Sequence, residues 1–246
     1  MERNIILTAL ALAITAAPLQ AQSDDFGIWT EVNAEKKINS QWSACVGAEY
    51  RSRDNAGEAD RWSFGADMSY KITDWLKASA GYTLLWDHNY KINSKATKYA
   101  DYWGVRHRFN VSLTASHSFG RLSVSLRERW QYTYRPEKTV MRYYLNTTAS
   151  HDAGEEDEEH TYSGKGKNVW RNRLMLKYKV SRMWRPYVSA ESSVASGLEK
   201  MRYAAGTEIR LNKHNSLDFK YLFQKIYGDD DEGDRHIIGI GYTYKF

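Results

Sequence analysis

Arginine side chains recur at every second position in two stretches of this chain, and they are the residues best suited to chemistry. Arg106 and Arg108 belong to one stretch, and Arg127 and Arg129 belong to the next. Because side chains alternate between the two faces of a β-strand, each pair lies on a single face. A short turn at Gly120-Arg121 makes the two strands neighbours. Four guanidinium groups in one such patch could bind a phosphate or a carboxylate bidentately.

The same alternation places further charged residues opposite the apolar ones, where they would line the inside of a closed sheet. The candidates for this lining are Glu49, Arg51, Asp67, Arg106, Arg108, Arg127, Arg129, Arg171, Arg173, Glu208 and Arg210. The interior of a barrel of about ten to twelve strands is narrow, and a charge buried there is costly unless it is paired. Two interpretations follow: a plug of ion pairs that neutralise one another, or a narrow channel whose arginines favour anions.

Histidine and serine, the residue types used by outer-membrane lipases and acyltransferases, occur at His107 and at Ser116-His117-Ser118. Neighbouring residues of a strand point to opposite faces, however, and no third orienting group follows at a fixed spacing. The histidines also show no metal-ligand spacing. We therefore predict no catalytic residue, no metal site and no cofactor, and a lipid-modifying or lipid-hydrolysing barrel enzyme stays an alternative.

Two acidic runs, at residues 155–159 and 229–232, fall in segments expected to be loops. On the external side of a membrane they could bind calcium or magnesium, although the second run lacks the spaced ligands of a calcium loop. Solvated disorder is the alternative interpretation. Divalent cations are accordingly a candidate partner at these loops.

Alternating apolar and polar residues run through most of the chain and predict the strands that would position these side chains. The alternation is cleanest over 62–72 and 76–86, and a helical spacing fits neither range. Eleven such strands can be counted. Bacterial single-chain barrels have an even number, so we expect twelve, with a short hairpin inside 90–103 or 136–168, or ten with the first segment outside the wall.

Short turns near residues 39, 74, 120, 182 and 213 alternate with longer connections near 55, 95, 150, 198 and 230. Outer-membrane barrels show this asymmetry, with tight periplasmic turns and longer external loops. The sequence thus predicts an all-β fold, a transmembrane antiparallel up-and-down β-barrel of about twelve strands. A second domain is not indicated, so residues 22–246 are expected to form the barrel.

The two ends of the chain carry signals for cellular location. Residues 1–21 combine Arg3, an apolar stretch and a small residue before Gln22, which predicts a secretory signal peptide. The last strand is apolar and aromatic on one face and ends at Phe246, which resembles the signal read by the outer-membrane assembly machinery. We expect the chain in the bacterial outer membrane, in contact with its lipids and, through Phe246, with that machinery.

The composition is compatible with this location. Aromatic residues make up 14% of the 246 residues, and Cys45 is the single cysteine, so no intrachain disulfide can form. The mean hydropathy of −0.68 is typical of a soluble protein. In a barrel, however, each strand alternates polar and apolar residues, so the mean value does not reveal the apolar outer face. The formal net charge is +5, and its basic residues are spread along strands, which argues against nucleic-acid binding.

Several short motifs add a family resemblance that covers most of the mature chain. They are Asp25-Phe26-Gly27-Ile28-Trp29, Glu49-Tyr50-Arg51-Ser52-Arg53-Asp54, Arg61-Trp62-Ser63, Gly81-Tyr82-Thr83, Arg106-His107-Arg108-Phe109-Asn110 and Leu126-Arg127-Glu128-Arg129-Trp130-Gln131-Tyr132. In these motifs the chain resembles a Bacteroidota family of outer-membrane β-barrels known only as a domain of unknown function, DUF2490. The resemblance implies the fold and the outer-membrane location but no activity. We expect a structural protein or a narrow channel for small solutes or anions; a lipid enzyme and a subunit of an envelope complex are the alternatives.

Overall fold

The computed structural model describes residues 24–148, 150–227 and 233–246, and all regular elements within them are β-strands. In these ranges no helix is long and apolar enough to cross a membrane. The predicted signal peptide at 1–21 and the acidic run at 229–232 lie outside the described residues.

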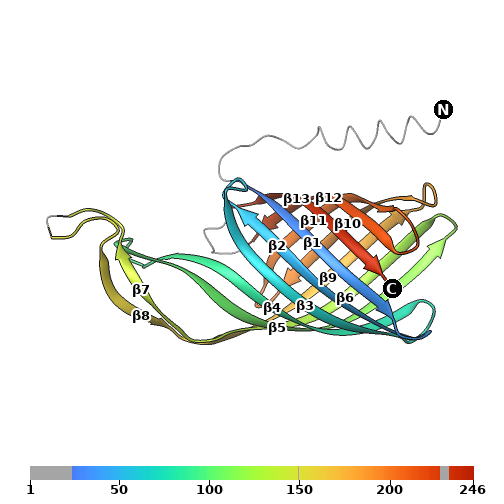
Figure 1. The fold of residues 1–246 in the computed structure, drawn as a ribbon, viewed down its shortest axis with the longest axis horizontal. Helices are drawn as coiled ribbons and strands as arrows, with labels where there is room; N and C mark the ends of the chain where they lie inside the picture. Colours follow the sequence, from blue (N-terminus) through green and yellow to red (C-terminus); the bar gives the residue numbers. More distant parts are fainter. Residues whose placement is uncertain (1–23, 149, 228–232) are drawn as a thin grey trace, which may run out of the picture.

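Thirteen strands form one continuous sheet (Figure 1). In chain order they are β1 (Asp25–Lys37), β2 (Trp42–Arg53), β3 (Glu58–Lys71), β4 (Leu76–Ile92), β5 (Lys98–Phe119), β6 (Leu122–Arg135), β7 (Lys138–Tyr144), β8 (Glu156–Tyr162), β9 (Lys165–Tyr178), β10 (Trp184–Val194), β11 (Leu198–Arg210), β12 (Asn215–Ile226) and β13 (Arg235–Lys245). Figure 1 shows the strands tilted against the long axis of the molecule, as closure into a barrel requires.

Eleven of these strands, all except β7 and β8, close into a barrel. Wall strands that follow one another along the chain pair antiparallel, and β6 pairs with β9 across the excluded hairpin. The ring closes where β1 pairs with β13 in parallel, from Asp25 opposite Arg235 to Glu35 opposite Lys245. The predicted transmembrane up-and-down β-barrel is confirmed, and eleven strands lie within the expected ten to twelve.

The expectation of an even strand number is wrong. A hairpin does lie within 136–168, but β7 pairs only with the outer end of β5 and with β8, so this hairpin stays outside the wall. The first segment, β1, lies inside the wall rather than outside it. The wall strands are therefore odd in number, which makes the first and last strands run in the same direction and their pairing parallel.

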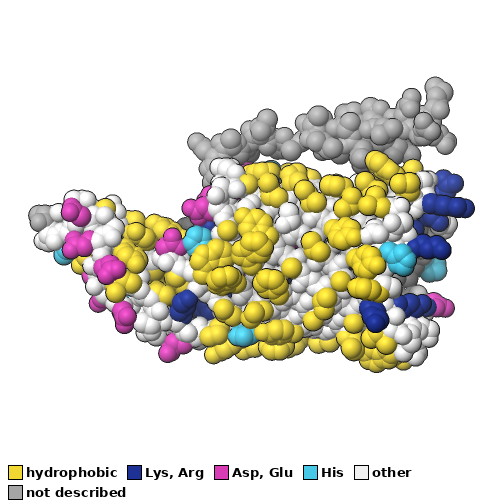
Figure 2. Space-filling model, viewed as in Figure 1, with side chains coloured by type: hydrophobic (Ala, Val, Ile, Leu, Met, Phe, Trp, Pro, Cys, Tyr) yellow, Lys and Arg dark blue, Asp and Glu magenta, His cyan; other side chains and the backbone are white. Residues whose placement is uncertain are grey.

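Hydrophobic side chains cover the outer wall of the barrel between its two ends (Figure 2). Val32, Phe64 and Trp86 are 57%, 53% and 49% exposed on this face. Such a band is what a lipid-facing wall requires, because an apolar surface of this extent is unfavourable in water. Glu128 interrupts the band, since it is exposed on β6 opposite Leu113 of β5.

Short turns close one end of the barrel, and four of them do so in the same way. The side-chain oxygens of Asn39, Thr73, Ser181 and Asn212 each accept hydrogen bonds from backbone N–H groups two and three residues later, at 2.8 to 3.4 Å. Asn, Ser and Thr favour turns for this reason. A fifth turn uses Gly120 at φ +60°, a conformation with little steric cost for glycine. These local bonds hold neighbouring strands in register.

A long arm extends from the opposite end of the barrel (Figure 1). It consists of residues 88–103, at the outer ends of β4 and β5, and residues 136–164, which contain β7 and β8. The last pair between β3 and β4 joins Arg61 and Asp87, so the arm begins where β4 leaves the wall.

The longer connection expected near residue 95 is a strand hairpin instead. β4 continues to Ile92, and Asn93 closes the turn by accepting hydrogen bonds from the backbone N–H groups of Thr97 at 2.8 Å and Lys98 at 3.1 Å. Aromatic rings stack across the two strands, as between Tyr90 and Tyr99 at 5.5 Å. Polar residues such as Asn89, Lys91 and Asn93 interrupt the apolar alternation in this stretch, which is why the sequence indicated a loop.

Candidate functional site

Inward-facing side chains of the barrel enclose two cavities. The outer cavity has a volume of about 340 Å³ and lies toward the arm. Ten of its lining residues are basic: Arg51, Arg61, Arg106, Arg108, Arg135, Lys165, Lys167, Arg171, Lys200 and Arg202. Glu199 is the one acidic residue of this lining within the described part of the chain. The outer cavity is therefore strongly cationic, and its field attracts anions.

The inner cavity has a volume of about 400 Å³ and a more balanced lining. Its charged residues include Glu31, Glu49, Asp67 and Glu191 as well as Arg127, Arg129, Arg173 and Lys220. Four arginines, Arg51, Arg108, Arg171 and Arg202, line both cavities and so lie at their junction. A solute that moves between the cavities must pass these four guanidinium groups.

Glu191 on β10 is the centre of the ion pairs near this junction. Arg127 lies 2.6 Å from its carboxylate, Arg171 donates to it from Nε at 3.1 Å, and Arg202 lies at 3.6 Å. The residue is only 6% exposed. One carboxylate thus faces three guanidinium groups, so this cluster keeps an excess of positive charge while satisfying the buried acid.

Two other acidic residues are held by arginines of the same interior. Asp87 accepts hydrogen bonds from Arg61 and lies 2.9 Å from Arg106 Nε. Glu49 accepts a hydrogen bond from Arg51 Nε at 2.7 Å. These contacts fix the planes of the guanidinium groups, because a bonded fork cannot rotate freely.

Four arginines that line the cavities, Arg108, Arg129, Arg135 and Arg173, face no carboxylate within 4.0 Å among the residues that the structure describes. Arg108 donates from Nε to the Thr133 hydroxyl at 3.4 Å, and Arg129 donates from Nε to the Ser112 hydroxyl at 2.8 Å. The Nε atom of Arg173 is buried without a hydrogen-bond partner in the same part of the chain. Their charges are therefore free of local neutralisation, which is the property an anion site needs.

Nine of the eleven predicted lumen residues line the two cavities: Glu49, Arg51, Asp67, Arg106, Arg108, Arg127, Arg129, Arg171 and Arg173. The other two, Glu208 and Arg210, lie near the short turns and outside both linings. They pair with each other at 2.8 Å, and Lys177 lies 2.7 Å from Glu208. The structure thus brings most of the set together and separates a small paired cluster from it.

Several charged residues of this interior were not among the predicted ones, and those with the closest ion pairs are Arg61, Asp87, Glu191 and Arg202. Strand parity could have found two of them. Glu191 alternates with the outward-facing Val188 and Ala190, and Arg202 shares the even-numbered face of Glu208. Their partners are distant along the chain, so no local pattern revealed the ion pairs.

The residues considered for enzyme chemistry do not come together. His107 lies on the outer face, where its Nδ1 is 2.8 Å from the Tyr82 hydroxyl. Ser118 is eleven positions further along β5, an odd separation that places it on the opposite face, and its hydroxyl contacts that of Ser123. This arrangement offers no nucleophile and base within hydrogen-bond reach.

Part of the acidic run at 155–159 forms β8 in the arm. Asp157 accepts hydrogen bonds from the Tyr144 hydroxyl at 2.7 Å and lies 2.5 Å from Lys98 Nζ. These bonds from Lys98 and Tyr144 lower the pKa of Asp157. Across the described ranges, no group of three histidine, cysteine or acidic side chains is arranged to hold a metal ion.

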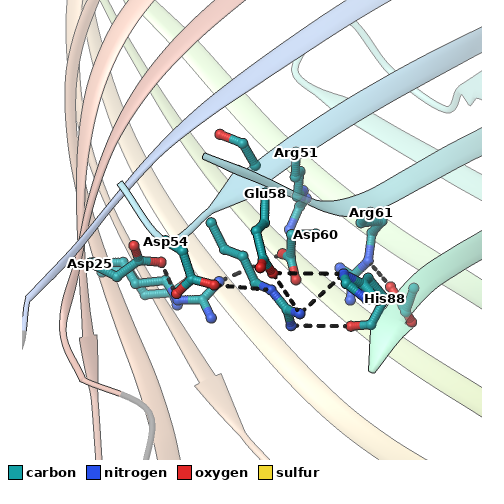
Figure 3. Close-up of polar contacts among 12 residues, drawn as sticks. Asp25, Arg51, Asp54, Glu58, Asp60, Arg61 and His88 are labelled. Carbon is teal, nitrogen blue, oxygen red and sulfur yellow. Dashed lines mark hydrogen bonds and ion pairs between the residues drawn. The ribbon is translucent and has the colours of Figure 1, made fainter. Parts of the chain in front are cut away.

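A separate polar network surrounds the arm-side rim of β1 to β4 (Figure 3). Arg53 lies 3.3 Å from Glu58 and 3.1 Å from His88 Nδ1, and Arg235 lies 3.6 Å from Asp60. These rim cations are paired with carboxylates, unlike Arg108 and its neighbours inside. The rim therefore holds the ends of the strands, and the excess positive charge lies within the lumen.

A family model described as protein of unknown function, DUF2490, matches residues 26–236 of this chain. The chain belongs to the DUF2490 family. No match was found among curated proteins. For this DUF2490 member, the comparison with solved structures therefore bears on the fold alone. Its chemistry follows from the side chains that line the lumen.

Two solved structures are similar to this DUF2490 barrel. The translocator domain of the autotransporter NalP from Neisseria meningitidis has a TM-score of 0.59 and 12% identity, over 96% of this chain and 93% of that one. The beta domain of the Bordetella autotransporter BrkA has a TM-score of 0.50 and 13% identity, over 84% and 82%. At such low identity the likeness shows the fold alone.

Proposed function

We propose that this protein is a narrow, anion-selective channel for small solutes in the bacterial outer membrane. One observation carries the proposal: four arginines lie at the junction of the two lumen cavities, and one of them, Arg108, faces no carboxylate within 4.0 Å among the described residues, like Arg129 and Arg173 of the inner cavity. Positive charge that is not neutralised locally attracts anions and repels cations. A barrel of this size has a small interior, so the conductance is expected to be low.

A barrel closed by its own ion pairs is the second candidate. The cluster of Glu191 with Arg127, Arg171 and Arg202 favours it, because these paired side chains occupy part of the narrow interior. The two candidates differ in one measurable property, since a plugged barrel passes no current.

Conductance of the refolded protein in planar bilayers tests the proposal. Under a potassium chloride gradient we expect a current whose reversal potential shows preference for chloride. The variant Arg108→Met should lower the chloride-to-potassium permeability ratio by about two- to fivefold, because one unpaired charge leaves the junction. It should still fold, since Arg108 has no ion pair to lose.

The matched control is Arg53→Met, which removes an arginine from the rim network. It should leave the permeability ratio unchanged, because Arg53 lines neither cavity. A silent bilayer would favour the plugged barrel, and an equal loss of selectivity in both variants would contradict a role for the lumen arginines.

The location and partners form part of the same proposal. The outer membrane of a Bacteroidota bacterium is supported by the barrel fold, by the DUF2490 membership and by the signal peptide expected at 1–21. Membrane lipids would contact the hydrophobic band, and the assembly machinery would bind the exposed Phe246. Divalent cations would bind the acidic side of the arm at 155–159, bridging it to lipid phosphates.

A further inference from the structure

A third, smaller cavity of about 140 Å³ lies where the arm joins the barrel. Arg106 and Arg135 line both this cavity and the outer cavity of the lumen, so the two are neighbours. Tyr102 of β5 and Tyr162 of β8 contribute the arm side of its wall. The cavity therefore stands at the mouth of the lumen, and we call it the mouth cavity.

Two hydrogen-bond donors of the mouth cavity are buried and have no partner among the described residues. They are the Tyr102 hydroxyl and Nε of Arg135. Leaving such donors unsatisfied is costly, and a native site normally supplies an acceptor for them. Arg106 cannot be that acceptor, because a guanidinium group only donates. The described residues therefore leave both donors of this site without an acceptor.

The charges around the mouth cavity indicate what kind of acceptor fits. Arg106, Arg135 and Lys138 line it, and Glu137, the acidic residue of its described lining, is exposed to solvent. Arg106 keeps its plane by donating to Asn89 at 3.1 Å. Three cations against one solvated carboxylate favour an anion over a neutral molecule.

Tyr102 is held in place before any ligand binds. Its ring stacks on that of Tyr162 with centroids 5.6 Å apart and planes 22° apart, and Lys138 Nζ lies 5.5 Å from its centroid. Burial raises the pKa of Tyr102, so its hydroxyl keeps the proton that it would donate. Donors fixed in this way lose little entropy on binding.

We propose that the mouth cavity binds the oxyanion group of a small solute, a carboxylate or a phosphate, through Tyr102 and Arg135. Oxyanions carry several acceptor lone pairs, so one group can satisfy both donors at once. The cavity volume is a few times the roughly 30 Å³ share of a water molecule, which suits one such group with the rest of the solute outside. The site deepens the proposed channel function, and its place on the transport route rests on that function.

Nuclear magnetic resonance of the refolded full chain in detergent micelles tests the site directly. Tyrosine is labelled with carbon-13 at Cζ, and sodium acetate or sodium phosphate is added. The Tyr102 signal is identified as the one missing from the spectrum of Tyr102→Phe. As the anion is added, the chemical shift of this signal should change and reach a plateau. In Tyr102→Phe, where Tyr162 reports binding, the dissociation constant should rise about ten- to hundredfold, as expected for one hydrogen bond to a charged group.

The matched control is Tyr90→Phe, since Tyr90 lies on the neighbouring strand β4 and is 48% exposed on the other face. It should bind as the unchanged protein does. Saturation by acetate identifies a carboxylate site, and saturation by phosphate identifies a phosphate site. A Tyr102 signal that saturates with neither anion, or that shifts equally with added chloride, overturns the proposal.

This measurement does not depend on conduction. Saturable binding in a protein that passes no current would contradict the channel and leave the mouth site standing. An anion-selective current without saturable binding would contradict the mouth site alone.

Discussion

Glu191 decides how much of the positive charge in the lumen is neutralised. It contacts arginines from β6, β9 and β11, so with its own strand β10 it links four neighbouring strands on the inner face of the wall. Arginine suits this position because its charge persists at any physiological pH and its planar group can bond to several acceptors. The same cluster therefore stabilises the barrel and sets the field that a solute meets.

Replacing Glu191 with glutamine should destabilise the barrel. The change leaves three guanidinium groups without their carboxylate, and breaking a buried ion pair costs about 3 to 5 kcal/mol, a range that hydration of the cavities reduces. The free energy of unfolding, measured by urea titration in micelles, should decrease by an amount that approaches this cost. The anion preference of the current should rise at the same time.

Glu199→Gln is the control for this change. Glu199 pairs with Lys167 at 2.6 Å in a more exposed position, and such pairs contribute about 0 to 1 kcal/mol. If both substitutions lowered the free energy of unfolding equally, the Glu191 cluster would contribute no more to stability than a surface ion pair.

At the scale of elements, the arm is the part of the fold that differs most from a plain barrel. Hairpins β4–β5 and β7–β8 extend past the wall and are held together by stacked aromatic rings, such as Tyr99 on Tyr143 at 5.5 Å. Its inner face continues the basic lining of the lumen through Lys91, whose Nζ lies 4.2 Å from the ring centroid of Tyr162. The arm therefore extends the positive field outward from the mouth cavity.

Anion binding at the mouth cavity should weaken as the pH rises through about 8. Burial, together with the charges of Arg135 and Arg106, lowers the pKa of Lys91 to about 8. Lys91 is therefore charged below that pH and neutral above it, whereas burial raises the pKa of Tyr102, so the Tyr102 hydroxyl stays neutral. The dissociation constant of acetate, which stays ionised throughout, should rise about two- to threefold between pH 7 and pH 9.

Two variants separate Lys91 from other groups in this titration. Lys91→Arg keeps its charge at every pH tested, so its affinity should stay high and flat. Lys91→Met should bind weakly and without dependence on pH. A pH dependence that persists in Lys91→Met would assign the effect to another group.

At the scale of the whole molecule, the parallel seam between β1 and β13 joins the first and last strands of the sheet. It places Phe246 beside β1, where its backbone N–H bonds to the carbonyl of Glu35 at 2.9 Å. The ring of Phe246 is 66% exposed and touches Tyr244 edge-on at 4.8 Å. The aromatic ring of Phe246 thus contributes little to packing in the folded barrel, which favours a role during assembly.

Replacing Phe246 with alanine should reduce the amount of folded barrel in the outer membrane of living cells. The free energy of unfolding of the refolded protein should change by less than about 1 kcal/mol, because an exposed ring loses little burial. Phe219→Ala is the control, since it removes a phenylalanine that is 41% exposed on the outer wall. Equal losses in cells for both variants would argue against a specific signal at the C-terminus.

The period-two alternation of the sequence was sufficient to predict the barrel, and nine of the eleven candidate lumen residues line its cavities. A bilayer outside and a hydrated lumen inside impose opposite polarity on successive residues, so this information is local. The side-chain oxygens of Asn39, Thr73, Ser181 and Asn212 make the turns local as well.

Strand number and ion pairing could not be read in this way, because both depend on contacts between distant residues. Whether β7 and β8 enter the wall depends on β6 pairing with β9, and the Arg127–Glu191 contact joins residues 64 positions apart. The mouth cavity likewise exists only because β8 folds back over β5 and sets Tyr162 against Tyr102. The local pattern predicts on which face of a strand a side chain lies. Which side chains it contacts depends on how the sheet closes.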